Sequence, residues 1–375
     1  MLVLTVNAGS STLKVSLVGD GVVRASTTRE WDGDREGTLR DALAALDLDG
    51  SQAPGREPDA VAHRVVHGGH ELTRHVLVDD GVVGSIEAAL ELAPLHNAPA
   101  LETLLAARSL FPGVPHVACF DTAFHATLPE AAARYPVPAE WHAAGIRRFG
   151  FHGLSVESAI GAAAVLLGRP ATELRIVVAH LGSGCSVTAV DGGRSAWTSM
   201  GYTPLEGIMM ATRPGSLDPG VVVEILRRGI ADLDGLADAL EHRSGMLGVS
   251  GRSGDVRELE AAADAGDPDA RLALEMFVTR AAAGIGAAAT WLPLLDAIAF
   301  TGGIGEHAAR LRAAIVGRLA ALGVPAIEAS ETAEDRVLAA GPPAVLRVAA
   351  REDLVMARVA ESLVSADSAS AARVD

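Results

Sequence analysis

The first 26 residues alternate between apolar runs and short polar turns. Apolar stretches cover Leu2 to Val6, Leu13 to Val18 and Gly21 to Ser26, and the turns between them contain Asn, Gly and Asp. Runs of this length that are bounded by turn residues are typical of β-strands. The sequence therefore predicts that the chain opens with a β-meander.

The pattern changes between residues 30 and 60, which are polar and contain Gly and Pro around one short helical repeat, Leu39 to Leu46. We interpret this stretch as a surface excursion that precedes a buried strand at Val61 to Val66. The elements predicted next are the helices Ser85 to Leu92 and Ala98 to Leu110 and the strand His116 to Phe120.

A second strand-turn-strand unit at Leu174 to Val190 repeats the opening pattern. With Gly9 laid on Gly182, each copy has an apolar strand, a small-residue turn and a second strand that ends in aspartate and glycine. Such self-similarity indicates a duplicated fold with two related domains. A chain of 375 residues with 49% hydrophobic content is large enough for two cores.

Helical and glycine-rich patterns follow in the second half. An alanine-rich helix is predicted at Asp269 to Thr290, and the apolar strand Leu294 to Phe300 runs into the turn TGGIG at Thr301 to Gly305. A glycine turn between a strand and a helix is a common docking place for anions and nucleotides. The amphipathic pattern from about Glu352 predicts a helix that packs back on the first domain, with Ser365 to Asp375 as a frayed tail.

Charge and cysteine content narrow the choice of partners. The formal net charge of -16 argues against nucleic acid, because binding a phosphate backbone needs a basic face. Cys119 and Cys185 lack the C-x-x-C spacing of metal or redox sites, which favours a reducing cytosol. The opening apolar run is too short for a signal peptide, and no run appears long enough for a bilayer. We expect a cytoplasmic protein that acts on small molecules.

The turn NAGSSTLK, from Asn7 to Lys14, combines flexible backbone amides with three hydroxyls and one cation. These are the groups that bind a triphosphate, although the spacing is not that of a Walker motif. Lys14 is the only lysine in the chain, which favours a position where a compact ammonium cannot be replaced by a guanidinium. An ordinary hairpin with serines is the alternative interpretation.

Two further glycine turns have similar chemistry. HLGSGCS runs from His180 to Ser186, and the third turn covers Gly303 to His307. Two amide-rich loops from two domains could grip one phosphate chain from opposite sides. The pairing is more informative than either loop alone, because a single glycine turn is common in proteins.

Four charged or polar residues are candidates for phosphoryl transfer. Arg64 lies in an apolar strand and needs an anionic partner there, whereas Arg213 lies in the glycine- and proline-broken segment TRPGSLDP. Arginines can fork onto phosphoryl or carboxylate oxygens, and a surface ion pair is the alternative for each. Asp121 could organise Mg²⁺ or its waters, or cap the next segment. His152 could donate to the phosphoryl group, or be a satisfied half-buried histidine.

These motifs resemble the acetate kinase family, within the acetate and sugar kinase/Hsp70/actin superfamily, over nearly the whole chain. The segments that carry the resemblance are VNAGSSTLK, HRVVHGG, APLHNAP, FDTAFHATLP, RFGFHGLS, HLGSGCS, TSMGYTPLEGIMMATRPGSLDP, SGRSGDVRELE and FTGGIGEH.

The resemblance implies an α/β fold of two duplicated actin-like (ribonuclease H-like) domains with a central cleft. The expected domains are residues 1–123 plus 354–375, and residues 124–353. The implied activity is a reversible in-line transfer of the γ-phosphoryl group of ATP to acetate, giving acetyl phosphate and ADP. Mg²⁺ is the expected metal, Mn²⁺ its substitute, and a homodimer the expected assembly.

The resemblance also implies a role for particular residues. The expected metal ligands are Asn7 and Glu352. The residues expected to surround the phosphoryl group are Arg64, Asp121, His152 and Arg213. The expected apolar pocket for the acid consists of Val66, Leu95, Phe151 and Pro204. The expected ATP and ADP contacts are Lys14, His180, Leu181, Gly182, Ser183, Gly184, Asp255, Val256, Arg257, Gly303, Ile304, Gly305, Glu306 and His307.

Three segments depart from the family pattern. Ser183 stands where asparagine is usual, GEHA replaces GENS and so introduces His307, and Ala350 to Asp353 replace TNEE. Two other activities remain open: a propionate or butyrate kinase, decided by the volume of the apolar pocket, and a non-catalytic ATP-binding module like actin or Hsp70. In the latter, Arg64, Asp121, His152 and Arg213 would have no purpose.

Overall fold

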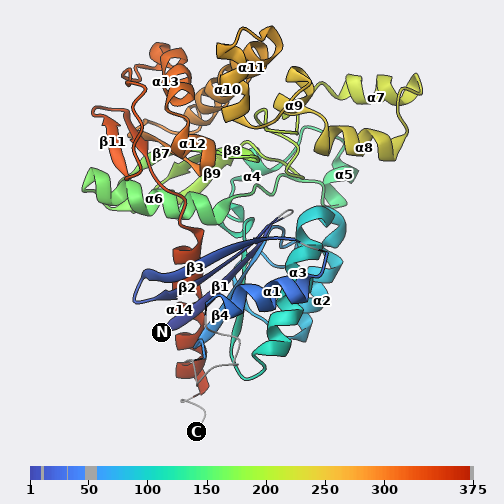
Figure 1. The fold of residues 1–375 in the computed structure, drawn as a ribbon, viewed down its shortest axis with the longest axis vertical. Helices are drawn as coiled ribbons and strands as arrows, with labels where there is room; N and C mark the ends of the chain where they lie inside the picture. The colour runs from blue at the N-terminus through green and yellow to red at the C-terminus, as the bar shows by residue number, and fades with distance from the viewer. Residues whose placement is uncertain (10–11, 32, 47–56, 372–375) are drawn as a thin grey trace. The chain divides into compact units, whose positions relative to one another are not determined.

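The computed structural model describes residues 1–9, 12–31, 33–46 and 57–371, which form two compact units (Figure 1). Unit 1 contains residues 1–126, 151–154 and the chain from 351 onward, and unit 2 contains residues 127–150 and 155–350. The expected domain limits differ from these units by a few residues and by the short stretch 151–154. That stretch belongs to unit 1 although residues of unit 2 flank it in sequence.

Unit 1 is built on a six-stranded mixed sheet in the order β3-β2-β1-β4-β6-β5. The first three strands form the predicted antiparallel meander, because each apolar run ends at a turn. β4 and β6 run parallel to β1, and β5 closes the edge in the antiparallel direction. The strands are β1 (Leu2–Ala8), β2 (Thr12–Gly19), β3 (Val22–Glu30), β4 (Ala60–Val65), β5 (Val76–Leu77) and β6 (His116–Phe120).

Helices cover both faces of this sheet. Successive residues of a strand point to opposite faces, so Val3 packs against α14 (Glu352–Ala371) while Leu4 packs against α1 (Arg35–Ala44) and α3 (Pro94–Leu110). Figure 1 shows α14 beside the strands of unit 1, and the helix contacts β4 and β6 as well as the meander. The helix continues to Ala371, so the prediction of a frayed tail from Ser365 was wrong.

The remaining elements of unit 1 are short. The helix predicted at Ser85 to Leu92 begins earlier and divides into an α-helix and a 3₁₀ turn. Part of the excursion predicted between residues 30 and 60 lies outside the described residues, and β3 and α1 occupy its first part. These short elements are α2 (Asp80–Ala88), η1 (Leu90–Leu92) and η2 (Ala123–His125).

Unit 2 repeats this topology. Its six strands follow the order β11-β12-β10-β7-β8-β9, with an antiparallel meander β7-β8-β9, two strands parallel to β7, and an antiparallel edge strand. The duplicated α/β fold predicted from the sequence is therefore confirmed. The strands are β7 (Arg175–Leu181), β8 (Cys185–Asp191), β9 (Arg194–Thr198), β10 (Ala297–Thr301), β11 (Arg336–Ala339) and β12 (Ala344–Arg347).

Helices of unit 2 often begin at an aspartate. Asp218, Asp232, Asp255 and Asp267 each accept a backbone N–H with the side chain, which satisfies donors at a helix start. The helices are α4 (Glu130–Ala133), α5 (Ala139–Ala143), α6 (Gly153–Leu167, whose first two residues belong to unit 1), η3 (Ala171–Glu173), α7 (Pro219–Arg227), α8 (Leu233–His242), α9 (Gly245–Ser250), α10 (Val256–Asp264), α11 (Pro268–Ala289), α12 (Gly302–His307), α13 (Ala309–Arg318) and η4 (Ala320–Leu322).

Among the described residues one helix, α11, is long and apolar enough to cross a membrane by length and composition. This differs from the expectation that no run reaches that length. Phe277 and Ile285 are fully buried, and α11 contacts β7, β8 and α9. The apolar character of α11 is therefore that of a core helix in unit 2.

Candidate active site

A buried ion pair lies at the ends of two neighbouring strands of unit 1. Arg64 is on β4 and Asp121 directly follows β6, and parallel strands bring both residues to one edge of the sheet. The Arg64 guanidinium donates from Nη2 to Asp121 Oδ2 at 2.5 Å and from Nε to Oδ1 at 3.1 Å. The side chain of Asp121 is 1% exposed. Asp121 is thus the anionic partner that the position of Arg64 requires.

Asn7 and Glu352 complete this charged cluster. Arg64 Nη1 donates to Asn7 Oδ1 at 3.1 Å, and Asn7 Nδ2 donates to Glu352 Oε2 at 3.2 Å. Arg64 Nε also lies 3.7 Å from Glu352 Oε2. Burial alone would lower the pKa of Arg64, but the charges of Asp121 and Glu352 raise it, so the guanidinium stays charged. Two carboxylates against one guanidinium leave the cluster with a net negative charge.

The donors of this cluster suit a hard cation. Asn7 offers an amide oxygen and Glu352 a carboxylate, and Mg²⁺ prefers oxygen ligands. Among the described residues no group of three His, Cys, Asp or Glu side chains could hold a metal ion by itself. Mg²⁺ commonly takes one or two protein ligands and completes its shell with water and phosphate. The residues present therefore fit Mg²⁺ bound together with a phosphorylated substrate.

Lys14 faces the same end of the sheet from β2. It is paired with Asn7 in the register of β1 and β2, and its Nζ donates to Asp353 Oδ2 at 3.0 Å. Ser16 Oγ donates to the same oxygen at 3.3 Å. Sequence reasoning assigned no role to Asp353, although it lies next to Glu352. Ser10 and Ser11 of the predicted phosphate turn lie outside the described residues.

The segment 151–153 brings three more groups to unit 1. His152 has a left-handed backbone (φ 59°), which is uncommon for a residue other than glycine. Gly153 N donates to Asp121 O at 2.9 Å, and a Cβ on Gly153 would lie 2.3 Å from that oxygen. Only glycine permits this approach. The Asp121 main chain therefore holds the segment that carries His152.

Two residues of the predicted acid pocket, Phe151 and Val66, are buried in unit 1. Phe151 is 1% exposed, and His125, whose pKa is lowered to about 4 by burial, donates from Nε2 to its carbonyl. Val66 is 6% exposed. Asn97 fixes the turn that follows Val66, since it bonds both the N–H and the C=O of His67. The side chain of Leu95 lies outside the described part of the chain.

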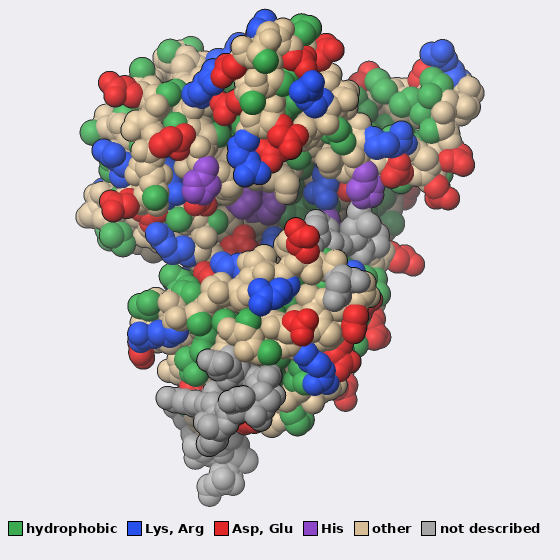
Figure 2. Space-filling model, viewed as in Figure 1, with side chains coloured by type: hydrophobic (Ala, Val, Ile, Leu, Met, Phe, Trp, Pro, Cys, Tyr) green, Lys and Arg blue, Asp and Glu red, His purple; other side chains and the backbone are tan. Residues whose placement is uncertain are grey.

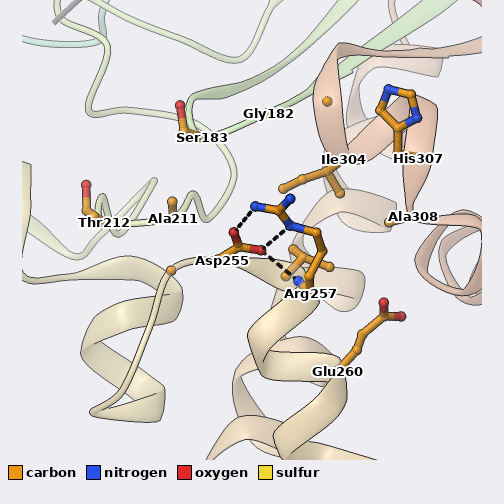
Figure 3. Close-up of a pocket in the computed structure, with 13 residues that line it drawn as sticks. Gly182, Ser183, Ala211, Thr212, Asp255, Arg257, Glu260, Ile304, His307 and Ala308 are labelled. Atoms are coloured by element: carbon orange, nitrogen blue, oxygen red, sulfur yellow. Dashed lines mark hydrogen bonds and ion pairs between the residues drawn. The ribbon is translucent and has the colours of Figure 1, made fainter. Parts of the chain in front are cut away.

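Unit 2 contains a cavity of about 630 Å³ (Figure 3). Its lining joins the three segments that the sequence singled out for nucleotide binding. The predicted residues among its lining are Gly182, Ser183, Asp255, Val256, Arg257, Gly303, Ile304 and His307. The lining residues that sequence reasoning missed are Ala211, Thr212, Gly254, Glu260 and Ala308.

The cavity depends on glycine at the ends of two parallel strands. β7 ends before Gly182 and β10 before Gly302, and a Cβ on Gly302 would lie 2.8 Å from Leu181 O. Gly302 also has a left-handed φ of 77°. The backbone can therefore approach closely here, which leaves amides and open space in front of the strands. Ala211, Val256 and Ile304 supply apolar surface suited to a planar base.

Asp255 and Arg257 form one edge of the cavity. Figure 3 shows the Arg257 side chain folded back onto Asp255, with Ile304 and His307 on one side and Glu260 on the other. Arg257 Nη2 donates to Asp255 Oδ2 at 2.5 Å, yet the Arg257 side chain is 89% exposed. The hydrogen bond from Arg257 lowers the pKa of Asp255 despite slight burial. An exposed guanidinium at a cavity rim can rearrange toward an anionic ligand.

Several predicted nucleotide contacts belong to the framework instead of the lining. His180 Nδ1 lies 2.7 Å from Ser155 Oγ, and Leu181 is fully buried. The Glu306 carboxylate accepts from Ala350 N at 2.9 Å and pairs with the buried Arg347 at 3.3 Å. Gly184 and Gly305, which the sequence also selected, shape the turns without lining the cavity.

Arg213 lies next to the lining residues Ala211 and Thr212. Ala211 N donates to Ser183 O at 3.1 Å, which joins the Arg213 segment to the second glycine turn. Arg213 Nε donates to Glu241 Oε2 at 3.1 Å. Burial raises the pKa of the Cys185 thiol to about 12, although the positive charge of Arg213 opposes this shift. The charge of Arg213 therefore acts on Cys185, which directly follows the glycine turn of the cavity.

A half-buried network fixes the segment that carries Pro204, which is itself buried. Arg148 donates from Nη2 to Glu206 Oε1 at 2.6 Å and from Nη1 to the carbonyl of Met200 at 2.9 Å. The Tyr135 hydroxyl donates to the other oxygen of Glu206. Sequence reasoning missed this network, because its members are spread over about 70 residues without a motif.

Comparison with known proteins gives a consistent result. The model of the acetokinase family matches residues 25–358. The acetate kinase of Synechococcus sp. is 40% identical and covers 98% of this chain and 100% of its own length. The structure of Porphyromonas gingivalis acetate kinase has a TM-score of 0.87 at 31% identity and covers 97% of this chain and 99% of its own. A propionate kinase from Francisella tularensis has a TM-score of 0.87 at 33% identity, with 96% and 99% coverage.

Proposed function

The chain belongs to the acetokinase family, and on that premise we propose that it is an acetate kinase, an enzyme that phosphorylates a carboxyl group. It transfers the γ-phosphoryl group of ATP to acetate reversibly and forms acetyl phosphate and ADP. One observation carries the proposal: the chain holds both a glycine-built cavity suited to a nucleotide and a buried Arg64–Asp121 pair at the ends of strands.

The nucleotide binds in the cavity of unit 2. Its base and ribose contact the apolar lining, and the amides of the turns at Gly182 and Gly303 are directed to phosphate oxygens. Arg257 can exchange Asp255 for a ligand because its side chain is exposed. Lys14 is also a proposed ATP contact. Its ammonium is paired with the Asp353 carboxylate, and an anionic ligand would compete with that carboxylate for it.

Phosphoryl transfer requires positioning and charge neutralisation more than covalent chemistry. Arg64 and Arg213 each present a guanidinium that can fork onto equatorial oxygens, and His152 donates a hydrogen bond. Acetate is already ionised near neutral pH, so it needs no general base. Asp121 instead holds Arg64 in place and maintains the negative charge that attracts the metal.

The metal is Mg²⁺, for which Mn²⁺ can substitute, and Asn7 and Glu352 would hold it. When bound, the ion supplies positive charge to the phosphate oxygens of the nucleotide. The departure from the family pattern at Ala350 to Asp353 keeps the two acids, and the second of them, Asp353, holds Lys14.

The acid's alkyl end contacts Val66 and Phe151 in unit 1, and we assign Leu95 and Pro204 the same role from the resemblance. The structural likeness to a propionate kinase makes propionate the first alternative substrate, and butyrate the next. One methylene changes selectivity by roughly 10- to 200-fold, so overlapping use of these acids is expected.

A non-catalytic ATP-binding module like actin or Hsp70 is the alternative of another class. Such a module has no need for an arginine paired with a buried carboxylate at the ends of β4 and β6. The Arg64–Asp121 pair therefore favours the enzyme.

One experiment separates these functions. ADP formation from MgATP is measured with acetate, propionate, butyrate or no acid, and acyl phosphate is trapped with hydroxylamine. We expect acid-dependent acyl phosphate, fastest with acetate, that falls about 10³-fold in Arg213→Ala, the scale seen for catalytic arginines. Nucleotide binding without acyl phosphate from any acid would support the binding module instead.

The proposed enzyme is a cytoplasmic homodimer. Figure 2 shows hydrophobic side chains exposed over the α7 region, and Val223, Ile230 and Leu233 there are 50%, 62% and 71% exposed. Isolated exposed apolar residues are normal, but a group on neighbouring segments, here α7, the connection after it and the start of α8, is typical of an interface. Sedimentation velocity of wild type and Val223→Asp tests this: a dimer that dissociates in the variant supports it, and a wild-type monomer contradicts it.

A further inference from the structure

Arg213 and its neighbour Thr212 are each bonded to one residue of a second element, Glu241. Glu241, in the last turn of α8, accepts from Arg213 Nε at 3.1 Å with its side chain. Its main-chain carbonyl accepts from Thr212 Oγ1 at 2.7 Å. Thr212 lines the nucleotide cavity, so Glu241 fastens the rim of the cavity and the neighbouring guanidinium together.

This pair differs from the other ion pairs on α8. The side chains of Arg213 and Glu241 are 15% and 24% exposed. Asp238, one turn earlier, pairs with Arg243 at 53% and 61% exposure. Exposed pairs contribute little because water and salt screen them, whereas a half-buried pair restricts a side chain more strongly. The geometry thus marks Glu241 as a structural partner of Arg213 instead of a solvent-facing charge.

The bond is made at the atom that sets the direction of the guanidinium. A carboxylate on Nε fixes the plane of the group, while Nη1 and Nη2 are the atoms that fork onto phosphoryl oxygens. Arg side chains lose rotamer entropy when they are fixed, and a plane that is already fixed reduces what must be lost when the fork forms. Correct orientation of this kind can change a rate by about 100-fold when it is lost.

We propose that Glu241 is a positioning residue for phosphoryl transfer, which acts by orienting Arg213. The inference rests on the proposed function, because Arg213 is taken to contact the phosphoryl group. Glu241 itself does not touch the reacting atoms. Its removal lowers the rate of transfer and leaves the nucleotide bound, since the glycine turns that shape the cavity keep their own contacts.

A double-mutant cycle tests the proposal. The turnover number kcat for acyl phosphate formation at saturating MgATP and acetate is measured for wild type, Glu241→Ala, Arg213→Ala and the double variant. We expect Glu241→Ala to lower kcat by about 10- to 100-fold in the wild-type background. It has no further effect in the Arg213→Ala background, because the two residues act as one unit.

Three controls accompany the cycle. Glu241→Gln keeps an oxygen that can accept from Nε and is expected to restore most of the rate. Asp238→Ala removes a carboxylate from the same helix and is expected to leave kcat unchanged. The affinity for MgADP, measured by calorimetry, and the thermal midpoint are expected to stay near wild type in Glu241→Ala, which separates orientation from unfolding.

Each outcome is decisive. Equal losses from Glu241→Ala in both backgrounds, or no loss in either, would overturn the positioning role while the enzyme remains an acetate kinase. A loss of nucleotide affinity that matches the loss of kcat would overturn it as well, because the effect would then be on the cavity. Absence of acyl phosphate from the wild type would overturn the proposed function, and the inference with it.

Discussion

The two units have the same sheet topology but place different chemistry at the ends of corresponding strands. In unit 1, β4 and β6 present Arg64 and Asp121, which are buried, charged and bonded to each other. In unit 2, β7 and β10 end at Gly182 and Gly302, and a cavity opens in front of them. The shared fold determines where a site lies, and the residues at the strand ends determine what it binds. Unit 1 is thus suited to bind charged groups, and unit 2 is suited to bind a nucleotide.

The largest expected effect comes from removing the guanidinium of unit 1. Arg64→Ala should lower kcat at least about 10³-fold, because a cation aimed at the phosphoryl group is lost. It should also destabilise unit 1 by about 3 to 5 kcal/mol, because Asp121 is left as a buried unpaired carboxylate. Acyl phosphate formation and thermal unfolding measure the two effects. Arg108→Ala is the matched control, because its pair with Asp80 is exposed and should contribute little. Turnover within tenfold of wild type would contradict the assigned role.

The next effect is specific to unit 2. Gly303 lines the cavity, and a Cβ built on it meets no atom within 4 Å, so Gly303→Phe can fill the cavity without backbone strain. We expect MgATP affinity to fall at least about tenfold, or roughly 1.4 kcal/mol, by calorimetry. Gly317→Phe is the matched control, because Gly317 is equally uncrowded but lies on α13 away from the lining. Unchanged affinity in Gly303→Phe would place the nucleotide elsewhere.

A smaller change concerns the acid. Val66 is buried at the end of β4, and Val66→Ala should leave room for about one more methylene. The ratio of kcat/KM for propionate to that for acetate should then rise about tenfold. Steady-state kinetics with both acids measure it, and Val165→Ala, at an 82% exposed position, is the control. A ratio that does not move would remove Val66 from the acid pocket.

The smallest expected effect is a loss of folding stability toward acid pH, which arises from two histidines of unit 1. His63 and His116 are stacked in the core, with Nε2 of one 2.9 Å from Nδ1 of the other. Burial lowers the pKa of His63, and the charge of His116 lowers it further. Burial also lowers the pKa of His116. The hydrogen bond to the Phe111 carbonyl raises that pKa, and the charge of Arg108 lowers it. Both rings are therefore neutral in the folded state. The unfolded chain binds more protons as pH falls below about 6.5, so this part of the stability is lost toward acid pH.

Thermal unfolding between pH 7.5 and 5 checks this sign, with about 1 to 2 °C expected per kcal/mol for a chain of 375 residues. Replacement of both rings, in His63→Leu with His116→Leu, should reduce the dependence in this range, and the part that remains should come from His125, whose pKa is lowered to about 4 by burial. A midpoint that falls with pH to the same extent in the double variant would contradict a contribution from the His63–His116 pair.

The sequence predicted the framework of both units because their signals are local. The meander, the strand that ends at Asp121 and the turn that begins at Gly302 each follow from an apolar run and a turn residue. α11 was predicted almost to the residue, since alanine periodicity extends over its whole length. Short edge strands such as β5 and β11 were not predicted, because two to four residues carry no periodicity.

The site was only partly accessible from sequence. Glycine turns and an arginine in an apolar strand are visible as letters, and the structure places them at strand ends. The partners of these residues are not visible: Asp353 for Lys14 and Glu241 for Arg213 are brought in by folding from 339 and 28 residues away. Glu306 is the opposite case. It lies in a predicted nucleotide motif, but its carboxylate pairs with Arg347 and accepts a hydrogen bond from Ala350 N.

The most direct test of the division between the units is the dissociation constant of metal-free ADP for Arg64→Ala, measured by calorimetry without acid. The account predicts a value within about threefold of wild type in a variant that has lost turnover, because the cavity of unit 2 keeps its lining. A loss of nucleotide affinity comparable with that of Gly303→Phe would contradict it, since nucleotide binding would then depend on the charged cluster of unit 1.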